Sequence, residues 1–361
     1  KPMQWILHAF KGGKYEVSAN TTYEEDAVEP ILRSLPFMNE ANITQPQDAA
    51  LQETDSGYVI TPEVEGNAMD EDKEAVQNET TELSLADQDC YLKPTVYQND
   101  EALNQQMNTL NSLTGAKLTY TVKGTTSTID HAVLKSWLVQ DENGNYAIDE
   151  SKEEEFINQL ADQIDTYGKS RKFTTHDGAQ ITLATNKYGW QVDREKSLED
   201  LKEALAEGKE QEMELSYSHK AKGSGDNDLG DVYVEISIDR QTMWCYKNGQ
   251  VVVETPVVTG DISKAGRATP KNGCWPIFWK TTEYTMNGPR DENGTPEYTT
   301  FVHYWMPFNG GVGIHDLASR GNNFGGDIYK TNGSHGCINT PLAAVKTIYE
   351  TVSVGTPVIV Y

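Results

Sequence analysis

Acidic residues are concentrated in the first two thirds of this chain. Up to and including Asp228 there are 20 basic and 43 acidic residues, a formal charge of −23, whereas the remainder of the 361 residues holds 10 and 12, a charge of −2. We therefore expect at least two kinds of domain, joined near this point. The segment 220–228 has the Gly, Ser and Asp composition that is typical of a linker.

The overall charge of −25 argues against nucleic acid as a partner, because such a protein repels phosphates. No apolar run approaches the roughly 18 residues that a membrane helix needs. The chain begins at Lys1 without a basic and apolar leader, so we expect a form from which an N-terminal anchor has been removed. The four cysteines are spread too widely for a zinc motif, and the pairing of Cys90, Cys245 and Cys274 in disulfides stays open.

The acidic part contains a faint duplication. Residues 58–70 resemble residues 181–193, because each segment has a strand pattern, a glycine turn and an aspartate that can begin a helix. The helices expected to follow span 72–77 and 197–207, and further strands are expected near 90–96 and 213–217. We therefore predict two similar α+β modules, 1–100 and 101–225.

The part after Asp228 is rich in β-strand patterns. Apolar residues alternate with polar ones over 232–239, as in a half-buried strand. An Asn-Gly pair at 248–249 predicts a hairpin between strands at 243–246 and 251–258. One helix is expected, with Thr340 as its cap, Pro341 at its first position and an apolar stripe through 342–352, followed by a strand over 356–361.

One cysteine lies in a sequence suited to a nucleophile. Cys337 belongs to the segment 334–339, Ser-His-Gly-Cys-Ile-Asn, directly before the expected helix. Imidazole and a helix N-terminus both lower a thiol pKa, so this position favours a reactive thiolate. The backbone amides of Gly336 and Cys337 are candidates for an oxyanion hole. His315, at the end of a short apolar strand 22 residues earlier, can supply the base.

These residues resemble the signature of L,D-transpeptidases with the YkuD domain, in which a histidine is followed by a [S/T]-H-G-C-x-N motif. The resemblance covers 229–361, and supporting segments lie at 256–260, 304–308 and 355–358. It implies a mainly β, sandwich-like catalytic domain with one helix after the cysteine. The acidic part resembles, more weakly, the peptidoglycan-binding modules that precede this domain in Gram-positive bacteria. In residues 269–273 the glycine that follows Thr-Pro in many members is displaced, so this loop is expected to be longer.

The resemblance assigns a role to each matching position. Cys337 becomes the nucleophile, His315 the base and His335 a polar group near the oxyanion, while Ser334, Gly336 and Asn339 shape the turn. Residue chemistry adds four candidates for substrate binding. Arg320 can meet a carboxylate, aromatic residues Tyr304 and Trp305 can line the cleft, and Asp316 can act only if its backbone folds it inward. No metal or other cofactor is expected.

The implied reaction takes place on peptidoglycan stem peptides. Cys337 attacks a tetrapeptide donor, D-Ala leaves, and the side-chain amine of an acceptor stem attacks the thioester to give a 3→3 cross-link. The substrate implies an extracytoplasmic enzyme associated with the cell wall, with a role in wall biogenesis and cell shape, and a target of carbapenems. Two alternatives stay open at this stage: a Cys-His L,D-carboxypeptidase or peptidase that only hydrolyses, and a wall-binding protein without catalysis.

Overall fold

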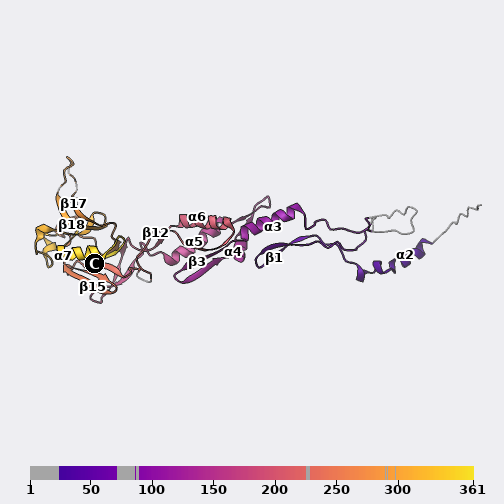
Figure 1. The fold of residues 1–361 in the computed structure, drawn as a ribbon, viewed down its shortest axis with the longest axis horizontal. Coiled ribbons are helices and arrows are strands. Elements are labelled where there is room, and N and C mark those ends of the chain that lie inside the picture. The colour runs from indigo at the N-terminus through magenta and orange to yellow at the C-terminus, as the bar shows by residue number, and fades with distance from the viewer. Residues whose placement is uncertain are drawn as a thin grey trace, which may run out of the picture. The chain divides into compact units, whose positions relative to one another are not determined.

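The computed structural model of the protein describes residues 24–70, 86, 89–224, 228–288, 290, 292–296 and 298–361. They belong to two compact units, Lys1–Asn111 and Ser112–Tyr361, each taken by itself below (Figure 1). The helix predicted over 72–77 lies outside the described residues. Among the described helices, none is both long and apolar enough to cross a membrane.

The first unit is built from short elements. It contains helix α2 (Glu25–Arg33), the 3₁₀ turns η1 (Pro36–Met38) and η2 (Glu40–Asn42), the hairpin of β1 (Ala50–Thr54) and β2 (Gly57–Thr61), and the start of helix α3 (Glu101–Thr114). The α3 side chain Asn111 accepts a hydrogen bond from Tyr58 N and donates one to Tyr58 O, which fixes the hairpin on the helix. The strand predicted near 90–96 is wrong, because only Tyr91 pairs there, in a single bridge to Met69.

The N-terminal half of the second unit is an α+β module. Its three-stranded sheet has the order β11-β3-β4 and packs under three helices. The elements are β3 (Lys117–Val122), β4 (Thr125–Ile129), α4 (His131–Ser136), β5 (Leu138–Gln140), β6 (Tyr146–Ile148), α5 (Glu150–Ile164), β7 (Arg171–Thr174), β8 (Gln180–Leu183), β10 (Gln191–Val192), α6 (Arg194–Glu207), β11 (Glu210–Met213) and β12 (Tyr217–His219). The predicted helix at 197–207 is confirmed within α6, where Leu201 and Leu205 are buried.

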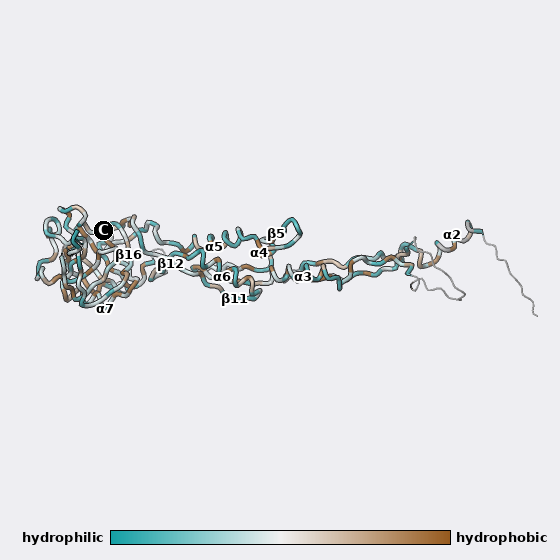
Figure 2. The backbone as a smooth tube through the Cα atoms, turned by 90° about the horizontal axis from the view of Figure 1, so that it is seen from above, coloured by the Kyte–Doolittle hydropathy of each residue, from teal (hydrophilic) through white to brown (hydrophobic). Residues whose placement is uncertain are grey.

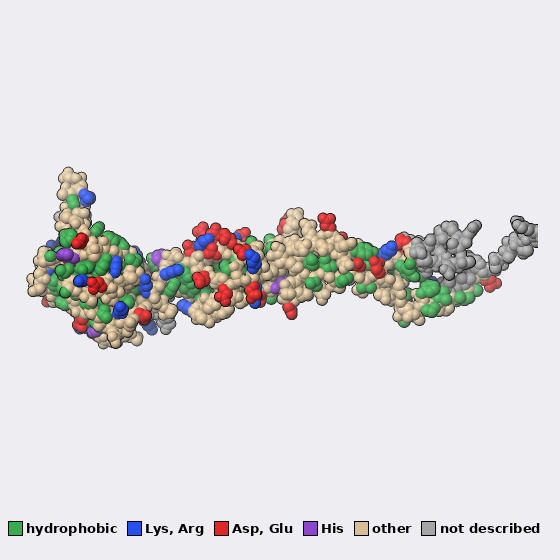
Figure 3. Space-filling model, viewed as in Figure 1, with side chains coloured by type: hydrophobic (Ala, Val, Ile, Leu, Met, Phe, Trp, Pro, Cys, Tyr) green, Lys and Arg blue, Asp and Glu red, His purple; other side chains and the backbone are tan. Residues whose placement is uncertain are grey.

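Charge distinguishes this module from the C-terminal half of the unit. Figure 3 shows acidic side chains gathered over α5 and α6, whose sequences are rich in Glu and Asp. Both helices begin at an aspartate whose carboxylate accepts a backbone N–H, Asp149 from Ser151 and Asp193 from Lys196. A carboxylate at this end also suits the helix dipole. The acidic residues of this module thus form a solvated helix surface, and two of them cap the N-termini of α5 and α6.

A six-stranded sheet forms one layer of the C-terminal half. Its order is β15-β14-β13-β21-β16-β9, with β9 (Thr185–Asn186), β13 (Val232–Ser237), β14 (Thr242–Lys247), β15 (Gln250–Pro256), β16 (Gly273–Pro276) and β21 (Pro357–Val360). The predicted hairpin is confirmed, since Asn248 and Gly249 between β14 and β15 both have positive φ, 52° and 74°. The outermost strand, β9, comes from before residue 229, so the sheet extends across the predicted domain boundary.

Both faces of this sheet are covered. One face carries the largest hydrophobic cluster, including Val234, Ile236 and Phe308, and the other packs on Phe173, Leu183 and Tyr188 from the upstream module. The half-buried strand predicted over 232–239 is therefore wrong in one respect. Glu235, expected on a solvent face, is fully buried and accepts hydrogen bonds from Tyr361 Oη and His176 N, both at 2.6 Å. Burial raises the pKa of this carboxyl.

The second layer is a four-stranded sheet. It has the order β17-β18-β19-β20, with β17 (Thr281–Asn287), β18 (Thr299–Asn309), β19 (Val312–Asp316) and β20 (Ile338–Thr340), and two 3₁₀ turns, η3 (Ala318–Arg320) and η4 (Ile328–Lys330). Helix α7 (Leu342–Thr351) buries Val345 and Ile348 in the cluster shared with the first sheet. In Figure 2 the tube of this half changes repeatedly between brown, hydrophobic stretches and teal, hydrophilic ones.

The start of α7 differs from the prediction. Thr340 belongs to strand β20 and its hydroxyl bonds Ile338 O, while Pro341 is the cap residue and makes no side-chain cap bond. The parallel pairing of β20 with β19 takes Thr340 out of the capping position. Local sequence could not show that pairing, because it is made with a strand more than twenty residues away.

A buried ion pair holds the end of the segment 220–228 against the α+β module. The Arg171 guanidinium bonds the Asp228 carboxylate, and their side chains are 6% and 1% exposed. Arg171 Nη2 also donates to Tyr188 O at 2.8 Å. We expect Arg171→Met to lower the free energy of unfolding by about 3–5 kcal/mol, because it leaves a buried carboxylate without its charge partner. Urea unfolding followed by tryptophan fluorescence measures this.

The control for that experiment is Lys152→Met. Lys152 pairs with Glu155 at 2.9 Å on the exposed face of α5, where an ion pair contributes only about 0–1 kcal/mol. Equal loss of stability in both variants would contradict the role given to Arg171.

Candidate active site

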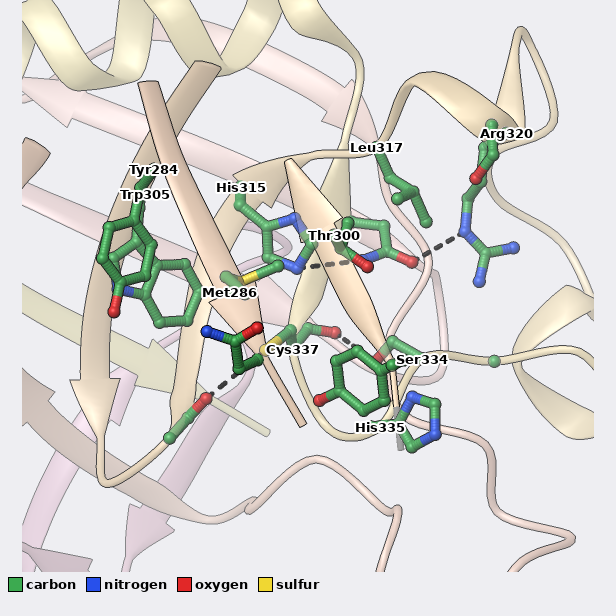
Figure 4. Close-up of a pocket in the computed structure, with 16 residues that line it drawn as sticks. Tyr284, Met286, Thr300, Trp305, His315, Leu317, Arg320, Ser334, His335 and Cys337 are labelled. Carbon is green, nitrogen blue, oxygen red and sulfur yellow. Dashed lines mark hydrogen bonds between the residues drawn. The ribbon is translucent and has the colours of Figure 1, made fainter. Parts of the chain in front are cut away.

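A cleft of about 410 Å³ opens between the β17–β18 hairpin and the loop that leads to β20 (Figure 4). Its walls hold both residues predicted to carry the chemistry, Cys337 and His315. The lining residues are Tyr284, Met286, Asn287, Tyr298, Thr300, Trp305, Gly311, His315, Leu317, Ser319, Arg320, Gly333, Ser334, His335, Cys337 and Asn339. Of the ten site residues predicted from sequence, seven line this cleft; Gly336, Tyr304 and Asp316 do not.

His315 is held in one orientation by its neighbours. It lies on β19, is 3% exposed, and its Nδ1 bonds the backbone carbonyl of Asp316 at 2.6 Å. A carbonyl only accepts, so Nδ1 carries the proton and Nε2 keeps its lone pair. Burial lowers the His315 pKa, against the opposing effects of the Asp316 carbonyl and carboxylate. The ring is therefore a neutral imidazole near pH 7, the form that a general base requires.

Cys337 lies just before β20 and is half-buried. Its thiol donates to Gly311 O with an Sγ to O distance of 3.5 Å. Burial raises the pKa of this thiol to about 11, although the Gly313 N–H acts in the opposite direction. The expectation of a thiol pKa lowered by a helix N-terminus is therefore wrong. Strand β20 separates Cys337 from α7, so the helix dipole does not begin at the sulfur.

The turn around Cys337 is fixed by side-chain bonds. Ser334 Oγ donates to Cys337 O at 2.6 Å and accepts from Gly336 N at 3.0 Å. Thr269 Oγ1 donates to Gly336 O at 2.7 Å, so the Thr-Pro loop at 269–273 supports the turn. Gly336 has φ +118°, which side chains rarely adopt, and this explains the glycine. Because the Gly336 amide already bonds Ser334, Cys337 N is the better candidate of the two for an oxyanion donor.

Asn339 has a larger part in the site than the sequence motif indicates. Its Nδ2 lies 3.2 Å from His315 Nε2, and its Oδ1 accepts from Arg320 Nε at 2.7 Å. Arg320 Nη2 donates to Asn332 O at 3.1 Å. Asn339 thus connects the guanidinium to the imidazole. Burial lowers the pKa of Arg320, and among the described residues it forms no ion pair with a carboxylate.

Two of the four predicted substrate contacts lie elsewhere. Tyr304 and Trp305 are neighbours on β18, and successive strand residues point to opposite faces. Trp305 lines the cleft, while Tyr304 packs on Tyr349 with ring centroids 5.1 Å apart. Asp316 is 2% exposed, and its carboxylate accepts from the backbone of His303 and Tyr304. Asp316 acts on His315 through its carbonyl, so its assignment to substrate contact is not supported.

The hairpin wall of the cleft was missed. Tyr284 and Met286 on β17 pair with Val302 and Thr300 on β18, and the Tyr284 ring stacks on Trp305 at 6.2 Å. Alternate residues of these strands share one face of the hairpin, a pattern that can be read from the sequence. The sequence does not say which face of the hairpin lies toward Cys337.

His335 lies at the exposed rim of the cleft. Its ring stacks on Tyr298, with centroids 4.6 Å apart, so it joins the loop before the nucleophile to the hairpin. Among the described residues, no group of three His, Cys, Asp or Glu side chains is arranged to hold a metal ion.

Comparison with known proteins shows the family of this chain. The YkuD model, an L,D-transpeptidase catalytic domain, matches residues 231–360, and a peptidoglycan binding domain model matches 93–214. The crystal structure of a cysteine-to-serine mutant of the Enterococcus faecium L,D-transpeptidase is 32% identical, with a TM-score of 0.54, covering 71% of this chain and 100% of that one. No curated protein matches the chain.

Two further solved structures are similar. The Ldtfm-avibactam carbamoyl enzyme is 32% identical with a TM-score of 0.54, covering 72% of this chain and 98% of that one. The catalytic domain from the E. faecium L,D-transpeptidase acylated by ertapenem is 42% identical with a TM-score of 0.32, covering 36% and 97%. Since the mutant E. faecium enzyme is matched over its whole length, this chain belongs to the L,D-transpeptidase family and is an L,D-transpeptidase with a peptidoglycan-binding domain before its catalytic domain.

Proposed function

We propose that this enzyme forms 3→3 cross-links in peptidoglycan through a thioester on Cys337. The observation that carries the proposal is that Cys337, the neutral imidazole of His315 and Arg320, which pairs with no carboxylate among the described residues, all line one cleft. The donor is a tetrapeptide stem, whose terminal D-Ala leaves. The acceptor is the side-chain amine of the third residue of another stem.

The first half-reaction begins with proton transfer. His315 Nε2 takes the Cys337 proton, and the thiolate sulfur attacks the carbonyl carbon between the third residue and D-Ala. The carbonyl oxygen becomes an oxyanion, to which the Cys337 amide can donate. When the intermediate collapses, the C–N bond breaks and the proton on Nε2 passes to the leaving amine of D-Ala. A thioester remains on the sulfur.

The second half-reaction reverses these roles. The acceptor amine attacks the thioester carbon and gives a proton to His315 Nε2, and the C–S bond breaks to restore the thiol. Water in place of the amine gives a shortened stem and no cross-link. The balance between the two products depends on how well the cleft holds an acceptor chain.

Arg320 is our candidate for the group that recognises the donor. A guanidinium has a planar set of donors that matches a carboxylate, and the bonds to Asn339 and Asn332 use only Nε and Nη2. The carboxylate that ends the donor stem is the partner that fits. Trp305 and Tyr284 can pack on the stem nearby.

The acidic modules are proposed to hold peptidoglycan near the catalytic domain. The division into modules at 1–100 and 101–225 and a catalytic domain at 229–361 stays a prediction. Peptidoglycan is extracytoplasmic, so the enzyme is associated with the cell wall. Attachment to the membrane and a role in cell shape also stay predictions.

β-Lactams and related inhibitors are a second class of compound expected to react with Cys337. Since avibactam forms a carbamoyl enzyme with the similar Ldtfm, we propose that Cys337 is carbamoylated by avibactam and acylated by carbapenems. In each case the strained carbonyl would accept the sulfur and its ring C–N bond would break. One adduct per chain is expected.

The proposal is tested with a tetrapeptide donor and a tripeptide acceptor. Mass spectrometry should show D-Ala and a cross-linked product in which the donor has lost its fourth residue. D-Ala with the tripeptide alone would instead indicate an L,D-carboxypeptidase. Neither product, with peptidoglycan still bound, would indicate a wall-binding protein and overturn the proposal.

A further inference from the structure

The imidazole nitrogen that must take the thiol proton already has a hydrogen-bond partner. His315 Nδ1 donates a hydrogen bond to Asp316 O, so Nε2 is the acceptor of the ring. Asn339 Nδ2 lies 3.2 Å from Nε2. The Cys337 thiol bonds Gly311 O at 3.5 Å. Among the described residues, no hydrogen bond joins Cys337 Sγ to the His315 ring. The amide of Asn339 and the thiol therefore compete for one lone pair.

The strength of the Asn339 bond depends on Arg320. Asn339 Oδ1 accepts from the positively charged Nε at 2.7 Å, a short charge-assisted bond. Electron density drawn toward that oxygen makes Nδ2–H a stronger donor to Nε2, because linked hydrogen bonds polarise one another. Asn339 is 2% exposed, so water does not weaken the chain of bonds.

The guanidinium of Arg320 stays protonated, so its positive charge can be offset only by a bound counter-ion. It lines the cleft and is half-buried, and no described carboxylate pairs with it. A carboxylate bound at the remaining N–H groups would offset the positive charge of the guanidinium. Arg320 Nε would then be a weaker donor to the Asn339 oxygen, and the Asn339 amide would in turn bond Nε2 less strongly.

From this arrangement we propose that Asn339 is a positioning residue that holds His315 Nε2 away from the Cys337 thiol until a carboxylate binds Arg320. The inference rests on the proposed roles of Cys337 and His315. No atom is gained or lost in the switch: the Nδ2–H to Nε2 bond and the Sγ–H to Gly311 O bond break, an Sγ–H to Nε2 bond forms, and the proton then moves to nitrogen. The donor's own terminal carboxylate would thus ready the nucleophile.

The charges around His315 agree with this direction. Arg320 acts to lower the His315 pKa, while Asp316 acts to raise it. The strands on either side of β19 each place an uncharged neighbour beside the ring: Trp305 on β18, at 5.6 Å between centroids, and Asn339 on β20. Neutralising Arg320 therefore also makes the imidazole more basic.

The test measures how fast iodoacetamide, an uncharged reagent, alkylates Cys337 at pH 7. Sodium acetate serves as the carboxylate probe, with sodium chloride at equal ionic strength and acetamide as its controls. Acetate should accelerate the wild-type reaction about 2- to 10-fold, the factor that one ordinary hydrogen bond provides. Acetamide should have no effect, because it lacks the charge.

Variants test whether Asn339 transmits the effect of Arg320 to His315 or only supports the structure of the cleft. Asn339→Ala should react in chloride as fast as the wild type in acetate, and acetate should add nothing. Arg320→Met should behave in the same way, and it decides the matter if Asn339→Ala does not fold. Asn322→Ala is the matched control: this exposed asparagine lies in the same loop as Arg320, and its backbone carbonyl, which the substitution keeps, accepts a hydrogen bond from Phe324 N.

Two kinds of failure can be told apart by peptide mapping of the alkylated protein. Three results would overturn only the proposed role of Asn339 and Arg320. They are the absence of an acetate effect in the wild type, an equal acetate effect in Arg320→Met, and slower alkylation of a well-folded Asn339→Ala. First labelling of Cys90, Cys245 or Cys274 would overturn the proposed nucleophile itself.

Discussion

Cys337→Ala is expected to release no D-Ala and to form no cross-linked stem, while its melting temperature stays within a few degrees of the wild type. Without the sulfur no thioester can form, and the oxyanion donor and base alone do not replace a nucleophile. The residue is half-buried at the wall of a cleft, so its truncation removes little of the core. Mass spectrometry of donor and acceptor stems, with calorimetry on the same sample, measures both quantities.

Cys245→Ser is the matched control. Cys245 is fully buried on β14, and burial raises its pKa to about 12, so it has neither access nor reactivity. Placing a hydroxyl in that core should cost stability and leave turnover per folded molecule unchanged. Product formation by Cys337→Ala, or loss of turnover in Cys245→Ser at an unchanged melting temperature, would show that the nucleophile is misassigned.

The two residues proposed to carry the chemistry, Cys337 and His315, could be selected from sequence because each stands in a distinctive local segment. The segment around Cys337 and the Gly-flanked strand that ends at His315 each indicate chemistry without knowledge of the fold, and both lie in the cleft. The same is true of the Asn-Gly hairpin and of the leucines in α6. These features depend on residues a few positions apart, so turn and helix rules reach them.

Properties set by distant parts of the chain were not predictable in this way. The predicted direction of the Cys337 pKa was wrong because burial of the thiol raises it, and because Thr340, the apparent helix cap, belongs to a strand that pairs with β19. Burial of Glu235 depends on a segment that lies more than fifty residues earlier in the chain. The bond from Asn339 to His315 joins residues 24 apart, so only tertiary structure shows it.

His315→Ala is expected to lower turnover at pH 7 by about 10²- to 10⁴-fold, the usual contribution of a positioned base. The size of this decrease depends on the pKa of the Cys337 thiol as well as on the loss of the imidazole. A thiol whose pKa is raised to about 11 is almost entirely protonated at pH 7, so without the base very little thiolate exists. His219→Ala is the control, because that exposed histidine stacks on Tyr167 and lies outside the cleft.

The pH dependence of turnover tests whether His315 acts as the base. In the wild type, turnover should rise as pH passes through the lowered His315 pKa, because the neutral imidazole is the base, and then level off. In His315→Ala no such step should occur, and the rate should climb about tenfold per pH unit toward the thiol pKa of about 11, following the thiolate fraction. The ratio of the two rates must therefore shrink as pH rises. A constant ratio between pH 6 and 9 would mean that His315 supports the structure of the cleft but does not take the proton from Cys337.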